Sequence, residues 1–188
     1  MKRVLGVSLA VLTLATVPMF AQDSDGGFFA AANLGYDVIG GGFAGGGSVG
    51  MEFSDFEAGL IAMYGNGETN YDDDEYEGTW DWELFLIGLR LNWVYRDLFP
   101  DPNLFPIVGA GFFYMNYAYT DSYTSDLYAD GEESDDVGAG GSLFSLGVGY
   151  AFTEEFDARL EVPVLVFFGD FGRIAVAIPV LVGVGVHF

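Results

Sequence analysis

Large apolar residues alternate with small ones along the last part of the chain, residues 174–188. Every second residue from Ile174 to Phe188 is large and apolar, whereas most of the residues between them are small. Because successive side chains of a β-strand point to opposite sides, this pattern places an unbroken apolar row on one face of a strand. A tilted strand needs only about 9–11 residues to cross a bilayer, so this segment is long enough to do so.

The segment just before it, residues 156–168, combines the same alternation with charge. Its apolar row begins at Phe156, and the opposite face carries Asp157, Arg159 and Glu161. In a soluble barrel the charged row would face water. In a membrane barrel the apolar row faces lipid and the charged row faces the lumen. One strand alone does not separate these two architectures.

The same alternation recurs through the chain and indicates eight strands, at residues 27–37, 43–53, 56–66, 80–95, 105–119, 141–152, 156–168 and 174–188. The faces opposite the apolar rows are rich in Gly, Ala and Ser, which suits a narrow barrel filled by its own side chains. Short connections are mixed with two long polar ones, residues 67–79 and 120–140, as in bacterial outer-membrane barrels. We therefore predict an all-β fold, an antiparallel up-and-down transmembrane β-barrel of about eight strands.

Aromatic residues gather near the ends of these predicted strands, at two levels. One level holds Phe53, Phe56, Trp93, Tyr95, Phe105, Phe152, Phe156 and Phe188, and the other holds Tyr36, Tyr64, Trp80, Trp82, Tyr117, Tyr119 and Phe168. Two such levels are typical of the aromatic girdles that lie at the two membrane interfaces.

The N-terminus has the features of a secretory signal peptide. Lys2 and Arg3 are followed by an apolar run, residues 4–17, and then by a proline and a small residue. The expected organisation is a helical signal peptide, residues 1–21, followed by an outer-membrane β-barrel domain, residues 22–188. The chain contains no Cys, which excludes disulfides and thiolate metal sites and is compatible with export.

The charge of the chain is strongly negative, with 28 acidic residues against six basic ones. Removal of the signal peptide would take away two of the basic residues, Lys2 and Arg3, and none of the acidic ones. Nucleic-acid binding depends on Lys and Arg side chains that neutralise phosphates, so this balance excludes a nucleic-acid partner.

The leader, the eight amphipathic segments and the terminal Val-Gly-Val-His-Phe resemble the small eight-stranded outer-membrane barrels of the outer membrane protein A and X type. The resemblance implies a monomer that contacts the lipid of the outer membrane of a diderm bacterium. A final apolar strand that ends in Phe is also similar to the signal recognised by the barrel assembly machinery. In this chain that signal would be formed by Val182, Val184, Val186 and Phe188.

Six charged residues fall on the faces that we predict to line the lumen: Glu52, Glu57, Arg90, Asp157, Arg159 and Glu161. Buried charges are tolerated when they are paired, so we favour a network of salt bridges that plugs the barrel. The alternative is a charged constriction in a small pore. An eight-stranded barrel has an interior just wide enough for side chains, which favours the plug.

The two long connections are acidic. The first holds Glu68, Asp72, Asp73, Asp74, Glu75 and Glu77, and the second holds Asp121, Asp126, Asp130, Glu132, Glu133, Asp135 and Asp136. The simplest interpretation is a solvated, repulsive surface. Weak binding of divalent cations by the carboxylates is a second hypothesis, although the spacing does not match an EF-hand loop.

Nothing in the chain marks an enzyme or a cofactor site. Its only His, His187, is next to last, far from the predicted outer loops, so a catalytic site at the outer leaflet would lack the commonest acid or base. We therefore expect no catalytic residues, no metal site and no cofactor. The predicted function is a structural or surface-interaction barrel with acidic extracellular loops. A narrow channel for small solutes is the alternative, and a secreted soluble barrel of the lipocalin type is a third class.

Overall fold

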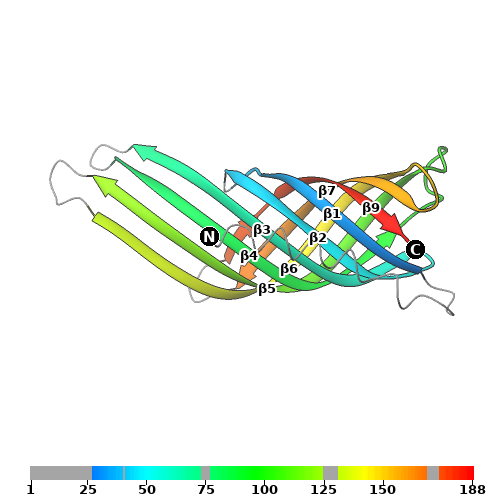
Figure 1. Ribbon diagram of the computed structural model, residues 1–188, viewed down its shortest axis with the longest axis horizontal. Coiled ribbons are helices and arrows are strands. Elements are labelled where there is room, and N and C mark those ends of the chain that lie inside the picture. The colour runs from blue at the N-terminus through cyan, green and yellow to red at the C-terminus, as the bar shows by residue number, and fades with distance from the viewer. Residues whose placement is uncertain (1–26, 40, 73–76, 125–130, 169–173) are drawn as a thin grey trace.

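The computed structural model describes residues 27–39, 41–72, 77–124, 131–168 and 174–188. These residues form β1 (Gly27–Asp37), β2 (Gly42–Phe53), β3 (Phe56–Asp72), β4 (Glu77–Val94), β5 (Leu104–Thr124), β6 (Gly131–Ala151), β7 (Phe156–Phe168), β8 (Ile174–Ala177) and β9 (Pro179–His187) (Figure 1). Within these ranges no helix is long and apolar enough to span a membrane. The predicted signal peptide, residues 1–21, lies outside the described part of the chain.

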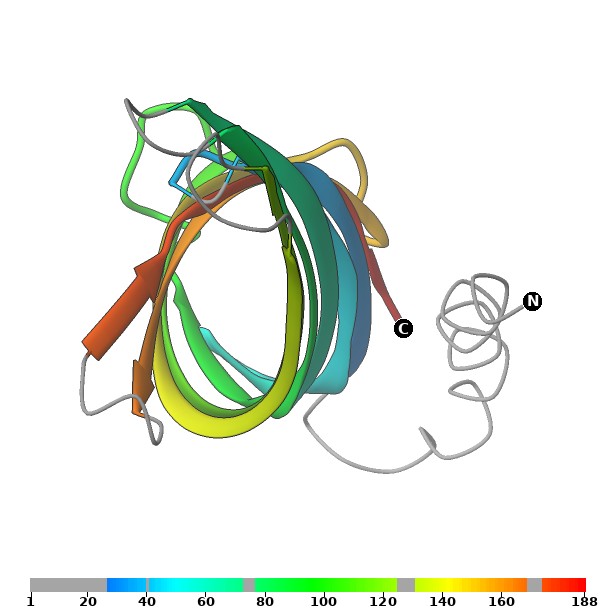
Figure 2. The ribbon, with the colours of Figure 1, turned by 90° about the vertical axis from the view of Figure 1, so that its left-hand side faces the viewer.

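Neighbouring strands pair antiparallel, and the sheet closes on itself. Each of β1 to β6 pairs with the next strand in the chain, and β9 pairs with both β7 and β1. Figure 2 shows the resulting ring along its axis. The strands β8 and β9 pair with β7 in one continuous register and are separated only at Ile178, so together they act as the eighth strand of the barrel. The predicted antiparallel up-and-down barrel is therefore confirmed.

The outer surface of the barrel is apolar. Leu34, Leu89 and Phe112 expose 63%, 65% and 73% of their surface, although they lie within paired strands. Their neighbours in sequence, such as Asn33 and Arg90, are buried inside. A soluble protein rarely exposes so large a continuous apolar surface, whereas a band of this kind is what a transmembrane barrel presents to lipid.

Two predicted long loops, residues 67–79 and 120–140, are wrong as loops, because most of their residues belong to strands. The strands β3, β4, β5 and β6 continue in register to Asp72, Glu77, Thr124 and Gly131. Backbone pairing does not depend on apolar side chains, so polar strands rich in Thr and Tyr extend the ladder beyond the apolar band. We call this part the outer extension, residues 67–72, 77–84, 117–124 and 131–139 (Figure 1).

The acidic residues of those connections are distributed accordingly. Glu68 and Asp72 lie on β3, Glu77 on β4, Asp121 on β5, and Glu132, Glu133, Asp135 and Asp136 on β6. The others, Asp73, Asp74, Glu75, Asp126 and Asp130, lie outside the described residues. The acidic surface is therefore carried largely by a sheet.

The two aromatic levels are also corrected at five positions, because Trp80, Tyr117 and Tyr119 stand in the lumen-side rows of β4 and β5, as do Trp82 and Phe105. Phe105 and Trp82 point into the barrel and are buried. Phe105 occupies the same face of β5 as Ile107 and Phe113, and Trp82 the same face of β4 as Leu86. The alternation within each strand, and not closeness to a strand end, therefore decides whether an aromatic side chain faces lipid or the lumen.

Candidate functional site

The interior of the barrel is divided along its axis into a polar and an apolar part. The end that carries the C-terminus holds the charged side chains. The middle of the barrel is filled by an apolar cluster, which consists of Ala44, Ile61, Met63, Leu86, Phe113, Met115, Ala139, Leu143, Leu165, Phe167 and Leu181. A smaller apolar group, Val94, Phe105 and Ile107, packs beside the charged part. Side chains from strands on opposite walls meet in both parts, so they fill the lumen.

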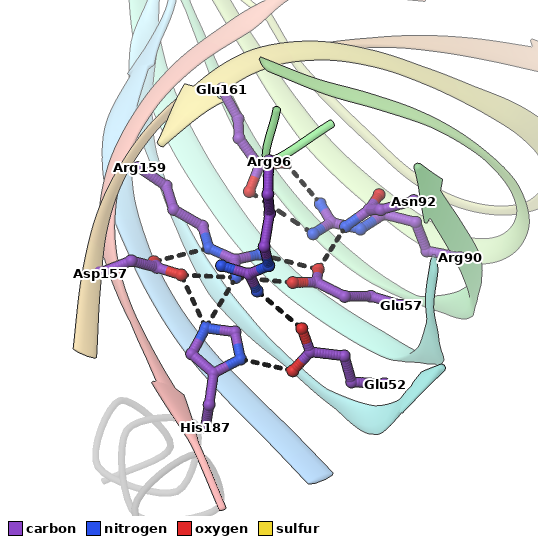
Figure 3. Close-up of polar contacts among 9 residues, drawn as sticks. All are labelled: Glu52, Glu57, Arg90, Asn92, Arg96, Asp157, Arg159, Glu161 and His187. Atoms are coloured by element: carbon purple, nitrogen blue, oxygen red, sulfur yellow. Dashed lines mark hydrogen bonds and ion pairs between the residues drawn. The ribbon is translucent and has the colours of Figure 1, made fainter. Parts of the chain in front are cut away.

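Arg159 is the centre of the charged part, and its side chain is completely buried. Its guanidinium donates two hydrogen bonds to Glu57, of 2.8 Å from Nη1 and 2.7 Å from Nη2. It donates two more to Asp157, both of 2.8 Å, from Nε and Nη2 (Figure 3). Bidentate guanidinium–carboxylate pairs are the strongest hydrogen-bonded ion pairs in proteins, and Arg159 makes two of them.

A second ion pair crosses the lumen beside this centre. Arg90 on β4 donates to Glu161 on β7, with 2.7 Å between Nη1 and Oε2, and both side chains are buried. Asn92, two residues from Arg90, donates from Nδ2 to Glu57 Oε2 at 3.0 Å. Because Glu57 also accepts from Arg159, this amide joins the wall of β4 to the centre of the network.

His187 and Arg96 complete the network at the C-terminal end. The two ring nitrogens of His187 lie 2.8 Å from a carboxylate oxygen of Glu52 and 2.7 Å from one of Asp157. A doubly protonated imidazolium satisfies both contacts with donated hydrogen bonds. Arg96 donates to the other oxygen of Glu52 at 2.6 Å.

The structure thus brings all six residues singled out from the sequence into one region: Glu52, Glu57, Arg90, Asp157, Arg159 and Glu161 (Figure 3). Sequence reasoning missed Asn92, Arg96 and His187 as members. Asn92 and His187 stand in the lumen rows of their alternating segments, and Arg96 continues the row of Asn92. Membership of a lumen row could therefore have identified all three residues. Asn92 was overlooked because it is uncharged, and Arg96 and His187 were overlooked because they stand at the ends of their rows.

One glycine makes room for this network. An added Cβ at Gly185, on β9, would lie 2.5 Å from Asp157 Oδ1 and 3.0 Å from Arg159 Nε. Any larger residue at this position would push the ion pair away from the wall. The glycine at this position is therefore matched to the large charged side chains of the neighbouring strand.

A metal ion is one chemical possibility at this place. Single donor atoms of Glu52, Glu57 and His187 lie within 4.8 Å of one another, a spacing at which they could share an ion. The two carboxylates, however, already accept hydrogen bonds from Arg96 and Arg159. A metal ion would have to displace these guanidinium contacts, so the arrangement is better suited to holding strands together than to binding a cation.

Comparison with known families identifies the chain. The family model described as the outer membrane protein beta-barrel domain matches residues 7–188. The chain belongs to this family. It therefore resides in the outer membrane of a diderm bacterium, where its apolar outer band contacts lipid. A search of curated proteins gave no match.

Several solved structures share the fold. Neisserial surface protein A is 19% identical with a TM-score of 0.52, and the alignment covers 87% of this chain and 96% of that one. The N-terminal β-barrel domain of Pseudomonas aeruginosa OprF is 21% identical with a TM-score of 0.50, covering 89% and 100%. A major outer membrane protein from Thermus thermophilus is 13% identical with a TM-score of 0.52, covering 88% and 100%. At these identities the likeness concerns the fold alone.

Proposed function

We propose that this protein is a monomeric, non-enzymatic barrel that does not conduct, and that it serves the outer membrane as a structural element and as a surface for interaction. The observation that carries the proposal is the filled lumen. The buried ion pairs Arg159–Glu57 and Arg90–Glu161 cross the barrel, and the apolar cluster occupies the space next to them. A pore needs a continuous row of polar, hydrated side chains, and the apolar cluster interrupts any such row.

The outer extension supports the second half of the proposal. It projects on the side opposite to the C-terminus (Figure 1). Short turns and termini lie on the periplasmic side in bacterial barrels, so the extension lies outside the cell. Exposed acidic side chains such as Glu68, Glu132 and Asp136 then form a surface that other molecules meet first.

Planar-bilayer recording tests the plug. The purified protein is folded in detergent, and its folded state is verified by its heat-modifiable mobility on a gel. We expect no steady single-channel current from this preparation at any applied voltage. A bacterial porin recorded in the same bilayers serves as the positive control. Reproducible conductance steps from the folded protein would overturn the proposal in favour of a narrow channel.

A further inference from the structure

Among the described residues, one face of the outer extension has no opposing strand above the mouth of the barrel. This face continues the lumen side of β3 to β6, but the strands of the opposite wall are shorter. The strand β7 ends at Phe168, opposite Gly140 of β6, and β2 begins at Gly42, opposite Gly67 of β3. Among the described residues no strand therefore stands across from it (Figures 1 and 2). We call it the inner face, and it includes Trp80, Tyr117, Tyr119, Asp121, Glu133 and Asp135.

Aromatic rings cluster on the inner face. The ring of Trp80 lies 6.4 Å from that of Tyr117 and 6.3 Å from that of Tyr119, both in edge-on orientation. Trp80 remains exposed, and the two tyrosines are half-buried. Rings that stay accessible in a polar, extracellular sheet present π-faces on which organic cations bind.

Carboxylates stand directly beside these rings. In the register of β5 and β6, Tyr119 lies opposite Asp135, and Asp121 lies opposite Glu133. Trp80 lies opposite Asp121 on the other side. A cation bound on this face would therefore contact aromatic rings and carboxylates together.

The extension has no positive charge of its own. The six basic residues of the chain are Lys2, Arg3, Arg90, Arg96, Arg159 and Arg173, and none of them lies in the two hairpins that form the extension. In the described part of the chain the basic side chains are Arg90, Arg96 and Arg159, and all three belong to the network at the other end of the barrel. No described residue therefore supplies a cation to the inner face. Rings interleave with the carboxylates, so the face suits the ammonium and guanidinium groups of Lys and Arg better than it suits a metal ion, which needs several converging oxygens.

We propose that the inner face binds an extended, Lys- and Arg-bearing segment of another polypeptide. Side chains on one side of an extended chain recur every two residues, which is the spacing of Glu133 and Asp135 along β6. From Gly131 to Ala139, β6 pairs only with β5 among the described strands. The bound polypeptide segment is extended like β6 and can therefore lie alongside it. This inference rests on the proposed function in placing the extension outside the cell.

The test uses the mature protein folded in nanodiscs of zwitterionic phosphatidylcholine, which does not attract basic peptides. An alternating Lys-Thr peptide of ten residues is the probe, and its Kd is measured by calorimetry at about 0.15 M salt. The variant E133Q/D135N removes two carboxylates of the inner face and is expected to weaken binding by about fivefold or more. The variant E132Q/D136N removes the same charge from the opposite face of the same strand and is expected to change the Kd by less than about twofold.

Three results would overturn the inference. These are no binding of the Lys-Thr peptide to the unmodified protein, equal weakening by the two double variants, and equal binding of an alternating Glu-Thr peptide. Equal weakening would mean that the peptide responds only to net charge. The Kd of spermine is measured in parallel. Spermine binding as tight as that of the peptide would overturn the polypeptide as the partner and indicate a small polyamine instead.

The variant Y119L separates ring from charge. It keeps every carboxylate and is expected to weaken peptide binding by about threefold, because one π-face is lost. Unchanged affinity would contradict the role given to the aromatic cluster. Bilayer recordings of the same preparation keep the two proposals apart, since a silent barrel that binds no peptide overturns only this inference, whereas a conducting barrel overturns the proposed function.

Discussion

At the scale of single residues, the interior network is notable for its balance. Its carboxylates are Glu52, Glu57, Asp157 and Glu161, and its cations are Arg90, Arg96, Arg159 and, when protonated, His187. The charges then cancel, which is the condition under which a narrow, poorly hydrated lumen can hold them. Removal of one charged side chain therefore lowers stability chiefly because its partners are left buried without a compensating charge.

The substitution Arg159→Met tests this dependence. It keeps most of the volume of the side chain but leaves Glu57 and Asp157 buried without their main partner. We expect the free energy of unfolding to fall by about 3–5 kcal/mol. The measurement is urea unfolding of the protein in lipid vesicles, followed by tryptophan fluorescence.

Arg96→Met is the matched control for this change. The side chain of Arg96 is 36% exposed, so its pair with Glu52 is screened by water. We expect this variant to lose no more than about 1 kcal/mol. Equal losses in the two variants would contradict the view that burial of Arg159 determines the effect.

At the scale of the elements, the break between β8 and β9 has a local cause. Pro179 has no backbone N–H and therefore cannot donate to the ladder. Next to it, the N–H of Ile178 donates to the side chain of Asp37 on β1 at 3.2 Å, and the N–H of Ile39 donates to the same oxygen at 3.2 Å. The buried carboxylate of Asp37 thus replaces a missing step of the ladder where the first and last strands meet.

Asp37→Ala is expected to destabilise this junction. The change leaves two partly buried N–H groups without an acceptor, so we expect a loss of about 1–3 kcal/mol in the free energy of unfolding. Hydrogen exchange of the Ile178 and Ile39 amides should accelerate in parallel. Asp37→Asn keeps the accepting oxygen and should retain most of the stability, and a loss as large as that of the alanine variant would argue against the hydrogen-bond explanation.

At the scale of the whole molecule, the closure of the barrel depends on the last strand. Phe188 and Phe28 exchange two backbone hydrogen bonds, of 2.8 Å and 3.2 Å, next to the strand pair β1–β9. The side chain of Phe188 is exposed, as are those of Val182 and Val184 on the same outward row, whereas Val186 is partly buried. This row lies on the outside of the barrel, where an assembly factor can reach it, and we propose that it is the assembly signal.

The substitution Phe188→Ala separates assembly from folding. The backbone contacts of residue 188 are kept, so we expect unchanged folding yield in detergent. In cells we expect the amount of folded protein in the outer-membrane fraction to fall by about tenfold or more, measured by heat-modifiable gel mobility, because the assembly machinery would no longer recognise the strand.

Phe152→Ala provides the comparison for this prediction. Phe152 is an exposed aromatic residue at the same end of the barrel, but it lies outside the final strand. It should leave the outer-membrane level within about twofold of the unmodified protein. A similar decrease for both variants would show that loss of an interfacial ring, and not loss of the terminal signal, explains the result.

The sequence by itself determined the strands and their orientation. The alternation of Leu160 with Arg159 and Glu161 is a local property, because neighbouring side chains on a strand must point to opposite sides. For the same reason, the first strand and the seventh agree with their predicted bounds, residues 27–37 and 156–168. The composition of the opposite faces was likewise enough to predict a narrow, filled barrel, since only small residues leave room for large ones across the lumen.

Only the tertiary structure decided which residues meet. Arg159 and Glu57 are separated by 102 positions in the chain, and their contact requires the closed ring that brings β7 across from β3. Closure also places His187 between Glu52 and Asp157, which no periodic pattern reveals. The outer extension depends in the same way on pairing between strands, because the backbone groups of its polar residues are paired only where the neighbouring strand extends beside them.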